Sequence, residues 1–91
     1  MTRLINTTTV TVSNPQQFTY DGDPNFTIGI VGGTATVDIY QGSEEDNLQL
    51  VGSIEESGVF KDAGSCSIVD VIVSAIGVDV TVKVDMTLKN S

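Results

Sequence analysis

Residues Val78–Leu88 have the sequence VDVTVKVDMTL, in which apolar and polar side chains alternate without interruption. Successive side chains of a β-strand point to opposite faces, so this pattern places six apolar residues on one face of an eleven-residue strand. A strand with one apolar face needs a second sheet to cover it. The chain is therefore predicted to be all-β: a small antiparallel β-sandwich or barrel-like domain.

Other segments bring the expected number of strands to seven or eight, at the spacing typical of a sandwich. The apolar residues of 26–30 and 35–39 alternate, and Gly32-Gly33 between them predicts a tight hairpin, because both positions of such a turn need φ > 0. Residues 67–75 are apolar on both faces apart from Asp70 and the serines, as in a central strand. The remaining expected strands are residues 4–13, 16–20, 48–54 and 59–61, with turns at 14–15, 21–24 and 62–65.

The length of 91 residues provides material for one domain with little stability in reserve. We expect residues 1–13 to form an N-terminal strand or arm and residues 14–91 to form a single β-sandwich domain. Cys66 is the sole cysteine, so no intrachain disulfide can form, and we expect its thiol to be a small buried filler. Small domains also gain buried area by association, and a homo-oligomer is therefore predicted.

Twelve acidic residues face four basic ones, which gives a formal net charge of −8. A nucleic acid or an anionic membrane would need a basic surface, so neither is an expected partner. Solubility explains the acidity; the alternatives are a partner with a basic surface or bound divalent cations. The sequence lacks an apolar leader and a twenty-residue apolar run, so we expect neither a signal peptide nor a membrane helix. With the lone cysteine, this favours assembly in a reducing cytoplasm.

The composition argues against an enzyme and against a bound cofactor. Histidine is absent, which removes the usual general base and the commonest metal ligand. Asp70 interrupts an apolar strand, and we expect it to face an edge or the solvent. Residues 21–25 begin like an EF-hand loop, but Phe26 and Gly32 stand where that loop needs glycine and glutamate. We expect solvated turns rather than metal sites there and at residues 44–47.

The segment Thr34–Leu88 follows a recognisable order: TATVDIYQGS, an acidic turn, LQLVGSI, SGVF, a Val/Ile strand, a glycine turn and the alternating final strand. This order resembles small β-sandwich accessory proteins of tailed bacteriophage virions, of the kind that decorate capsids. The resemblance implies a non-enzymatic structural protein on the virion surface. Its partner would be the major capsid protein or another virion protein, and by analogy it would be a trimer. Similar patterns occur in carbohydrate-binding sandwiches, although Leu48 stands where those usually have an aromatic residue.

Each function implies its own site. A decoration protein would make contact through its N-terminal segment and through edge strands added to a neighbour's sheet; the alternative for this segment is an ordinary first strand. The expected interface residues are Thr2, Arg3, Leu4, Ile5, Val10 and Val12. A carbohydrate- or cell-surface-binding module would instead hold its ligand with Tyr20, Tyr40, Glu44, Glu45 and Asp46.

Overall fold

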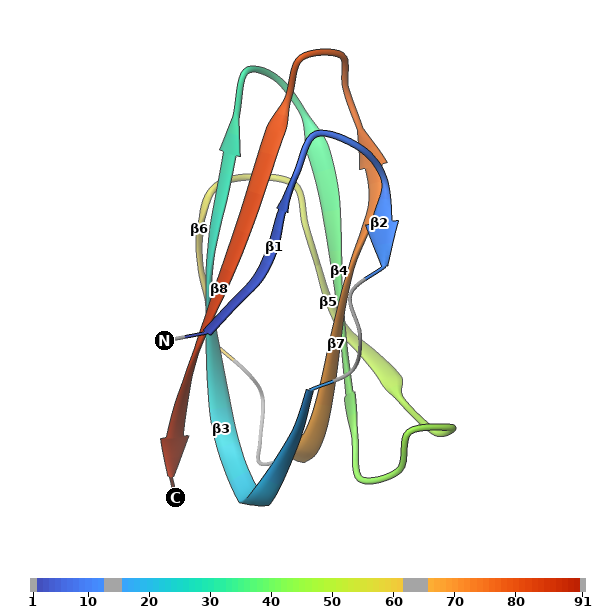
Figure 1. Ribbon diagram of the computed structural model, residues 1–91, viewed down its shortest axis with the longest axis vertical. Helices are drawn as coiled ribbons and strands as arrows, with labels where there is room; N and C mark the ends of the chain where they lie inside the picture. Colours follow the sequence, from blue (N-terminus) through green and yellow to red (C-terminus); the bar gives the residue numbers. More distant parts are fainter. Residues whose placement is uncertain (1, 13–15, 62–65, 91) are drawn as a thin grey trace.

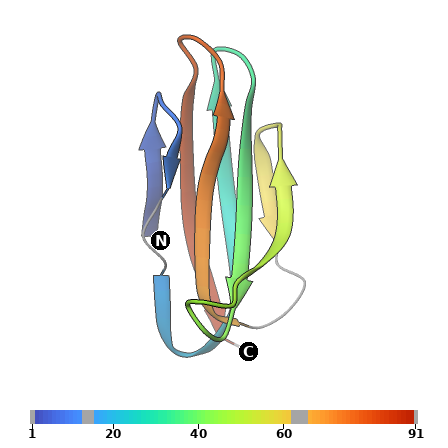
Figure 2. The ribbon, with the colours of Figure 1, turned by 90° about the vertical axis from the view of Figure 1, so that its right-hand side faces the viewer.

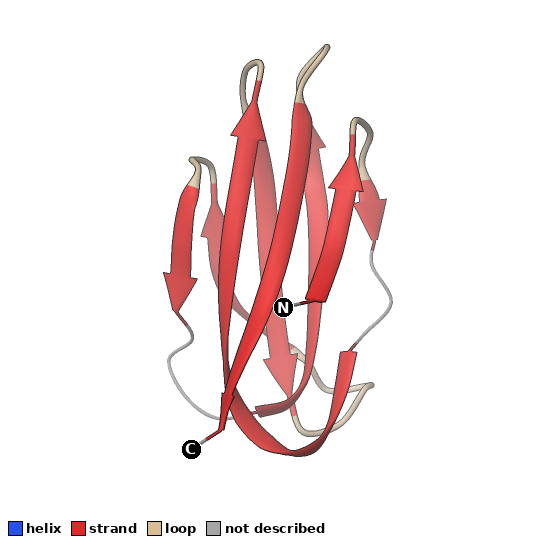
Figure 3. Ribbon diagram, turned by 60° about the vertical axis from the view of Figure 1, so that its left-hand side comes forward, coloured by secondary structure: helices blue, strands red, loops and turns tan. Residues whose placement is uncertain are grey.

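The computed structural model describes residues 2–12, 16–61 and 66–90, which form strands and the loops between them (Figure 1). The strands are β1 (Thr2–Thr7), β2 (Thr11–Val12), β3 (Gln16–Val31), β4 (Ala35–Gly42), β5 (Gln49–Ile54), β6 (Gly58–Lys61), β7 (Cys66–Ile76) and β8 (Thr81–Asn90). Every strand pair is antiparallel. The strands account for most of the described chain, and the rest is turns and loops (Figure 3).

The strands form two packed sheets, seen edge-on in Figure 1 and face-on in Figure 2. One sheet has the order β1-β8-β3-β6, and the other has the order β7-β4-β5 with the two-residue β2 on the free edge of β7. Leaving out β2, the sandwich has four strands in one sheet and three in the other, and it is not a closed barrel. The predicted β-sandwich is thus confirmed, and the barrel-like alternative is wrong.

The order β1-β8-β3-β6 against β2-β7-β4-β5 is that of a small jelly roll, a double-sheet arrangement of two Greek keys. Consecutive strands β1 and β2 lie on opposite sheets at one side of the sandwich, and β5 and β6 do so at the other side (Figure 2). The sixteen-residue β3 belongs to both sheets, since its first residues pair with β7 and its later ones with β8 and β6.

The core between the sheets consists of β-branched residues with few aromatic rings, as expected from the composition. Burying each such side chain contributes about 1.5–3 kcal/mol. The central position predicted for residues 67–75 is confirmed, because β7 pairs with β4 along one edge and with β2 and β3 along the other. Cys66 is buried, also as expected. The buried apolar residues of the core are Ile5, Phe26, Ile28, Ala35, Val37, Ile39, Cys66, Ile68, Val69, Val71, Val73, Val80, Val82, Val84 and Met86.

The predicted strand Val78–Leu88 begins three residues too early. β8 starts at Thr81, and Val78 lies in the preceding turn with 89% of its surface exposed. At this point the chain leaves the sheet of β7 and enters the sheet of β8, with Asp79 at φ 59°. The chain must bend where it passes from one sheet to the other. The alternating sequence pattern begins in this bend, three residues before β8 itself begins. Leu88 lies in β8, but its side chain is outside the described part.

The predicted turn at Gly32-Gly33 is present, and Gly32 has φ 99°. The predicted hairpin is wrong, however, because β3 and β4 do not pair and belong to opposite sheets. The turn is an arch between sheets, packed beside the β7–β8 arch: the Gly77 N–H donates to the Thr34 carbonyl at 2.9 Å. We call residues 32–34 and 77–80 together the arch end of the sandwich.

The predicted turn at residues 21–24 is also wrong, because β3 runs through it. Pro24 is fully buried and lies opposite Leu88 of β8. A proline has no N–H to donate to a strand ladder, and the described pairing of β3 with β6 ends at Asn25, one residue after Pro24. Residues 16–20, predicted as a separate edge strand, are the first part of β3. The turns predicted at residues 14–15 and 62–65 lie outside the described residues.

Candidate functional site

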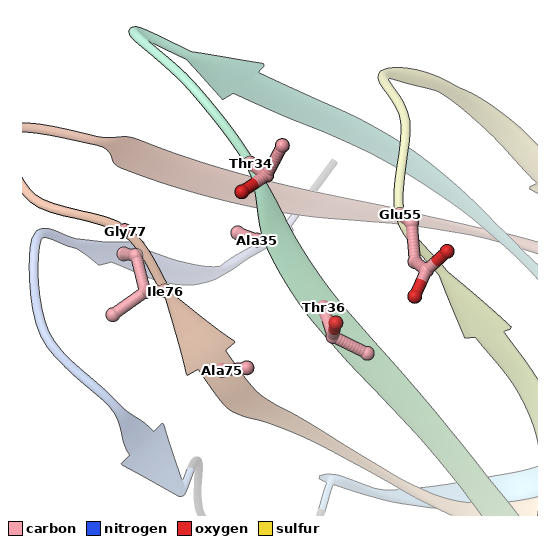
Figure 4. Close-up of a pocket in the computed structure, with 7 residues that line it drawn as sticks. All are labelled: Thr34, Ala35, Thr36, Glu55, Ala75, Ile76 and Gly77. Atoms are coloured by element: carbon pink, nitrogen blue, oxygen red, sulfur yellow. The ribbon is translucent and has the colours of Figure 1, made fainter.

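Two adjoining hollows lie beside the arch end, with volumes of 390 and 420 Å³. They share Thr34 and Glu55. In Figure 4 the side chains of Thr36, from β4, and Glu55, from the β5–β6 turn, extend toward the same space. Hydroxyl and carboxylate groups in this arrangement can hydrogen-bond a polar ligand. The first hollow is lined by Thr34, Ala35, Thr36, Glu55, Ala75, Ile76 and Gly77, and the second by Ile30, Gly33, Thr34, Glu55, Glu56 and Ser57.

The turn that carries Glu55 is fastened to the edge of β3 by a serine. The Ser57 hydroxyl accepts a hydrogen bond from the Ile30 N–H at 2.8 Å and lies 3.2 Å from the Ile30 carbonyl, to which it donates. These bonds continue the β3–β6 ladder beyond Gly58, where β6 begins. The wall of the hollows is therefore tied to the sheet rather than formed by a detached loop.

The outer face of the β7-β4-β5 sheet carries a second candidate site. Residues paired across strands lie side by side on one face, and the register places Asp70, Tyr40 and Leu50 in one row. The next row is Ile72, Asp38 and Ser53, in which the Ser53 hydroxyl donates to Asp38 Oδ1 at 2.6 Å. Leu50 is 54% exposed. We call these six residues the Tyr40 face; Asp70 lies on it, toward solvent as expected.

The N-terminal residues expected to form an interface do not share one surface. Ile5 is 3% exposed and belongs to the core, whereas Val10 is 59% exposed in the loop after β1. Leu4 packs partly against the core at a bulge between Arg3 and Ile5. Thr2 lies opposite Met86 of β8, and Val12 lies opposite Ile72 of β7, but their side chains are outside the described part. Ile5 is thus unavailable to a partner.

Arg3 of that set is engaged within the chain. Its Nε and Nη2 donate to Asp85 Oδ1 and Oδ2 at 2.8 and 3.2 Å. The hydrogen bond from Arg3 lowers the pKa of the Asp85 carboxyl below its ordinary value, and the same bond raises the pKa of Arg3. The pair fastens the edge strand β1 to β8.

The expected ligand residues are not gathered into one pocket either. Tyr40 lies on the outer face of β4, and the exposed Glu44, Glu45 and Asp46 lie in the β4–β5 loop, where the Asn47 N–H donates to the Glu44 carbonyl at 3.0 Å. Tyr20 lies in β3, and its side chain is outside the described part. The EF-hand-like residues 21–25 also lie in β3, not in a loop. Among the side chains that the structure describes, no three potential metal-ligating residues gather at one point.

The basic residues are confined to one of the two sheets, a feature that was not predicted from the sequence. All four basic residues lie on strands of the β1-β8-β3-β6 sheet: Arg3 on β1, Lys61 on β6, and Lys83 and Lys89 on β8. The β7-β4-β5 sheet and loop 43–48 hold five acidic residues and no basic one: Asp38, Glu44, Glu45, Asp46 and Asp70. The turn 55–57, which joins the two sheets, adds Glu55 and Glu56, and the β1-β8-β3-β6 sheet carries Asp21, Asp23 and Asp85 beside its basic residues. The signal becomes visible only when each strand is assigned to its sheet.

Comparisons with protein-family models, curated proteins and solved structures found no match. Within residues 2–12, 16–61 and 66–90, no helix has the length and hydrophobicity needed to span a membrane. The features that bear on function are therefore the arch-end hollows, the Tyr40 face and the division of charge.

Proposed function

We propose that the protein is a non-enzymatic structural protein of a bacteriophage virion, a decoration protein that docks on the capsid surface. The observation that carries the docking role is the division of charge between the two sheets. A sandwich in which all charged residues of one sheet are acidic presents a surface of negative charge on that side. Such a surface steers and orients a positively charged partner. The resemblance of Thr34–Leu88 to virion accessory proteins supports the capsid as that partner.

The fold is compatible with this role without deciding it. Jelly rolls occur in viral capsid proteins and in lectins, and a shared fold does not imply a shared function. The chain has no histidine, so general acid–base chemistry would fall to carboxylates. In the described residues the carboxylates of the acidic sheet stand on its outer face and in its loops.

The structure favours contact through a face over the edge-strand addition expected from the sequence. Edge strands that are short or bulged resist pairing with another chain. β2 and β6 have two and four residues. β1 has a register shift between Arg3 and Ile5, and β5 has one opposite Ile39 and Tyr40. The decoration protein is therefore proposed to use an outer face of the sandwich.

The proposed homo-oligomer, a trimer by analogy, forms on the shell. A net charge of −8 makes free subunits repel one another, which keeps them soluble before docking. On the shell, basic groups of the capsid offset this repulsion. The subunits assemble in the host cytoplasm and end on the virion surface.

Mass photometry of undecorated tailed-phage capsids, with and without the purified protein, tests the proposal. We expect the capsid mass to rise and saturate at a fixed, symmetry-related number of copies, and to fall back at high salt. An unchanged capsid mass at saturating protein would overturn the decoration role.

A carbohydrate- or cell-surface-binding module is the second candidate, favoured by the hollow in Figure 4. The hydroxyls of Thr34 and Thr36 and the carboxylate of Glu55 are groups that bind sugar hydroxyls by hydrogen bonding. A glycan array with the wild-type protein and Glu55→Gln tests it. Selective binding that Glu55→Gln abolishes supports the module, and a blank array contradicts it.

A further inference from the structure

We propose that the Tyr40 face (Asp38, Tyr40, Leu50, Ser53, Asp70 and Ile72) is the docking surface, and that its occupant is a protein surface bearing arginine or lysine. This inference rests on the proposed docking function and adds to it the face used and the chemistry of the partner. It follows from the register of β4, β5 and β7 and from the charge of the sheet they form.

The face has room for one or two side chains of a partner, as at the centre of a larger contact. Neighbouring strands lie about 4.8 Å apart, so three strands span about 10 Å, and two rows on one face lie about 7 Å apart. The two acidic residues of this area, Asp70 and Asp38, are diagonal neighbours on adjacent strands. Tyr40 stands between Asp70 and Leu50, and Asp38 between Ile72 and Ser53. A partner side chain on Tyr40 therefore lies within reach of two carboxylates.

Arginine and lysine match this pattern. A tyrosine ring attracts a cation over its face, and a carboxylate binds a guanidinium through two parallel hydrogen bonds. Asp38 accepts one hydrogen bond from Ser53 at Oδ1, and a carboxylate has room for about four. The bond from Ser53 also holds the carboxylate in place. Leu50 and Ile72 provide apolar area for the aliphatic stems of these side chains.

The charges favour a basic partner over a second copy of this chain. Two copies of a protein of net charge −8 repel each other as they approach. The opposite sheet has four basic residues, and one of them, Arg3, is already paired with Asp85. The exposed Glu44, Glu45 and Asp46 lie in the loop that follows β4, the strand of Tyr40. They extend the acidic region and would attract a basic surface to this side.

A titration followed by ¹H–¹⁵N correlation NMR locates the docking surface. The probe is the capped peptide acetyl-Gly-Arg-Gly-Arg-Gly-amide, and the control peptide has citrulline, the neutral isostere, in place of arginine. We expect the arginine peptide to shift amide signals of residues 38–40, 50–53 and 70–72, and the citrulline peptide to leave them in place. Shifts centred elsewhere, or equal shifts with both peptides, would overturn the inference.

A charge-matched pair of double variants separates a local site from general attraction. Asp38→Asn/Asp70→Asn and Glu56→Gln/Asp79→Asn both remove two negative charges, the first pair from the face and the second from exposed positions at or beside the arch end. We expect the first to weaken peptide binding about five-fold, since two exposed ion pairs are lost, and the second less than two-fold. Equal weakening would contradict a local site. Melting curves of both variants check that each is folded.

Tyr40→Ser tests the aromatic contribution, which general charge attraction does not require. Removing an aromatic anchor from a contact weakens binding about ten-fold. If folded Tyr40→Ser binds the arginine peptide as tightly as the wild type does, the Tyr40 ring does not contribute to docking and this part of the inference is wrong.

The capsid assay keeps this inference separable from the proposed function. If capsids bind the wild type and Asp38→Asn/Asp70→Asn equally, the decoration role stands and the docking face is wrong. If the arginine peptide maps to the Tyr40 face but capsids bind nothing, the face stands and the decoration role is wrong.

Discussion

Phe60 of β6 lies with its ring against Gly52 of β5, and this contact joins the two sheets at one side of the sandwich. A Cβ built on Gly52 would lie 2.6 Å from both Cε1 and Cζ of Phe60. The ring also packs against Phe26, with ring centroids 6.3 Å apart. Gly52→Ala therefore cannot be accommodated unless the Phe60 ring moves away from its place beside Phe26.

Overpacking of this kind costs about 1–3 kcal/mol. For a domain of this size, whose total stability is about 5–14 kcal/mol, such a loss is measurable. Urea unfolding followed by far-UV circular dichroism suits the chain, which has no tryptophan. With a slope of about 1 kcal/mol per molar urea, a loss of 2 kcal/mol lowers the midpoint by about 2 M.

A double-mutant cycle with Phe60→Ala isolates the cause. Without the ring, Gly52→Ala should cost less than about 0.5 kcal/mol, or even stabilise, since glycine is unfavourable in a strand interior. The matched control is Gly29→Ala in β3, where an added Cβ meets nothing within 4 Å. Equal costs of Gly52→Ala with and without the Phe60 ring would refute the steric explanation.

Three further predictions follow from single contacts. Val82→Ala should cost about 2 kcal/mol in urea unfolding and Val78→Ala almost nothing, because only Val82 lies in the core. Ser57→Ala should cost about 1 kcal/mol and speed amide exchange at the edge of β3 that Ser57 caps. Because the hydrogen bond from Arg3 lowers the pKa of Asp85, the folded chain binds that proton less readily than the unfolded chain. The resulting stability is present above the unfolded value of about 4 and is lost as the pH falls through the lower folded pKa. Urea titrations should therefore show Asp85→Asn closer to the wild type at pH 2.5 than at pH 7; equal differences at both values would contradict this origin.

Local patterns in the sequence predicted the strands and most of the core. The alternation of Ala35, Val37 and Ile39 places these three side chains inward, as the structure confirms. The same rule holds for Val82 and Val84 in β8. Side-chain period depends only on neighbours along the chain, so it can be read without knowledge of the rest of the fold.

The pairing of strands could not be predicted from such patterns. Gly32-Gly33 marks a turn, but a glycine turn serves a hairpin and an arch between sheets equally well. Val78 fits the period of β8, yet the change of sheet occurs there. The residues at 21–24 have turn chemistry, but the pairing of Pro24 with Leu88 keeps the chain in β3. Long-range contacts decided each case.

The candidate sites have the same limitation. Tyr40 was identified from the sequence, while its place between Asp70 and Leu50 required the register of three strands. The net charge was known from composition, but its division between the sheets depends on the jelly-roll order. Ile5 was expected at an interface because a decoration protein would make contact through its N-terminal segment; the structure places it in the core.

Cryo-electron microscopy of capsids saturated with the protein tests the central claim, docking through the acidic sheet, most directly. We expect density at symmetry-related sites in which the β7-β4-β5 sheet faces the shell, with Tyr40 at the contact and basic capsid residues opposite Asp38 and Asp70. Density in which the β1-β8-β3-β6 sheet or the β1 edge makes the contact, or capsids with no added density, would contradict it.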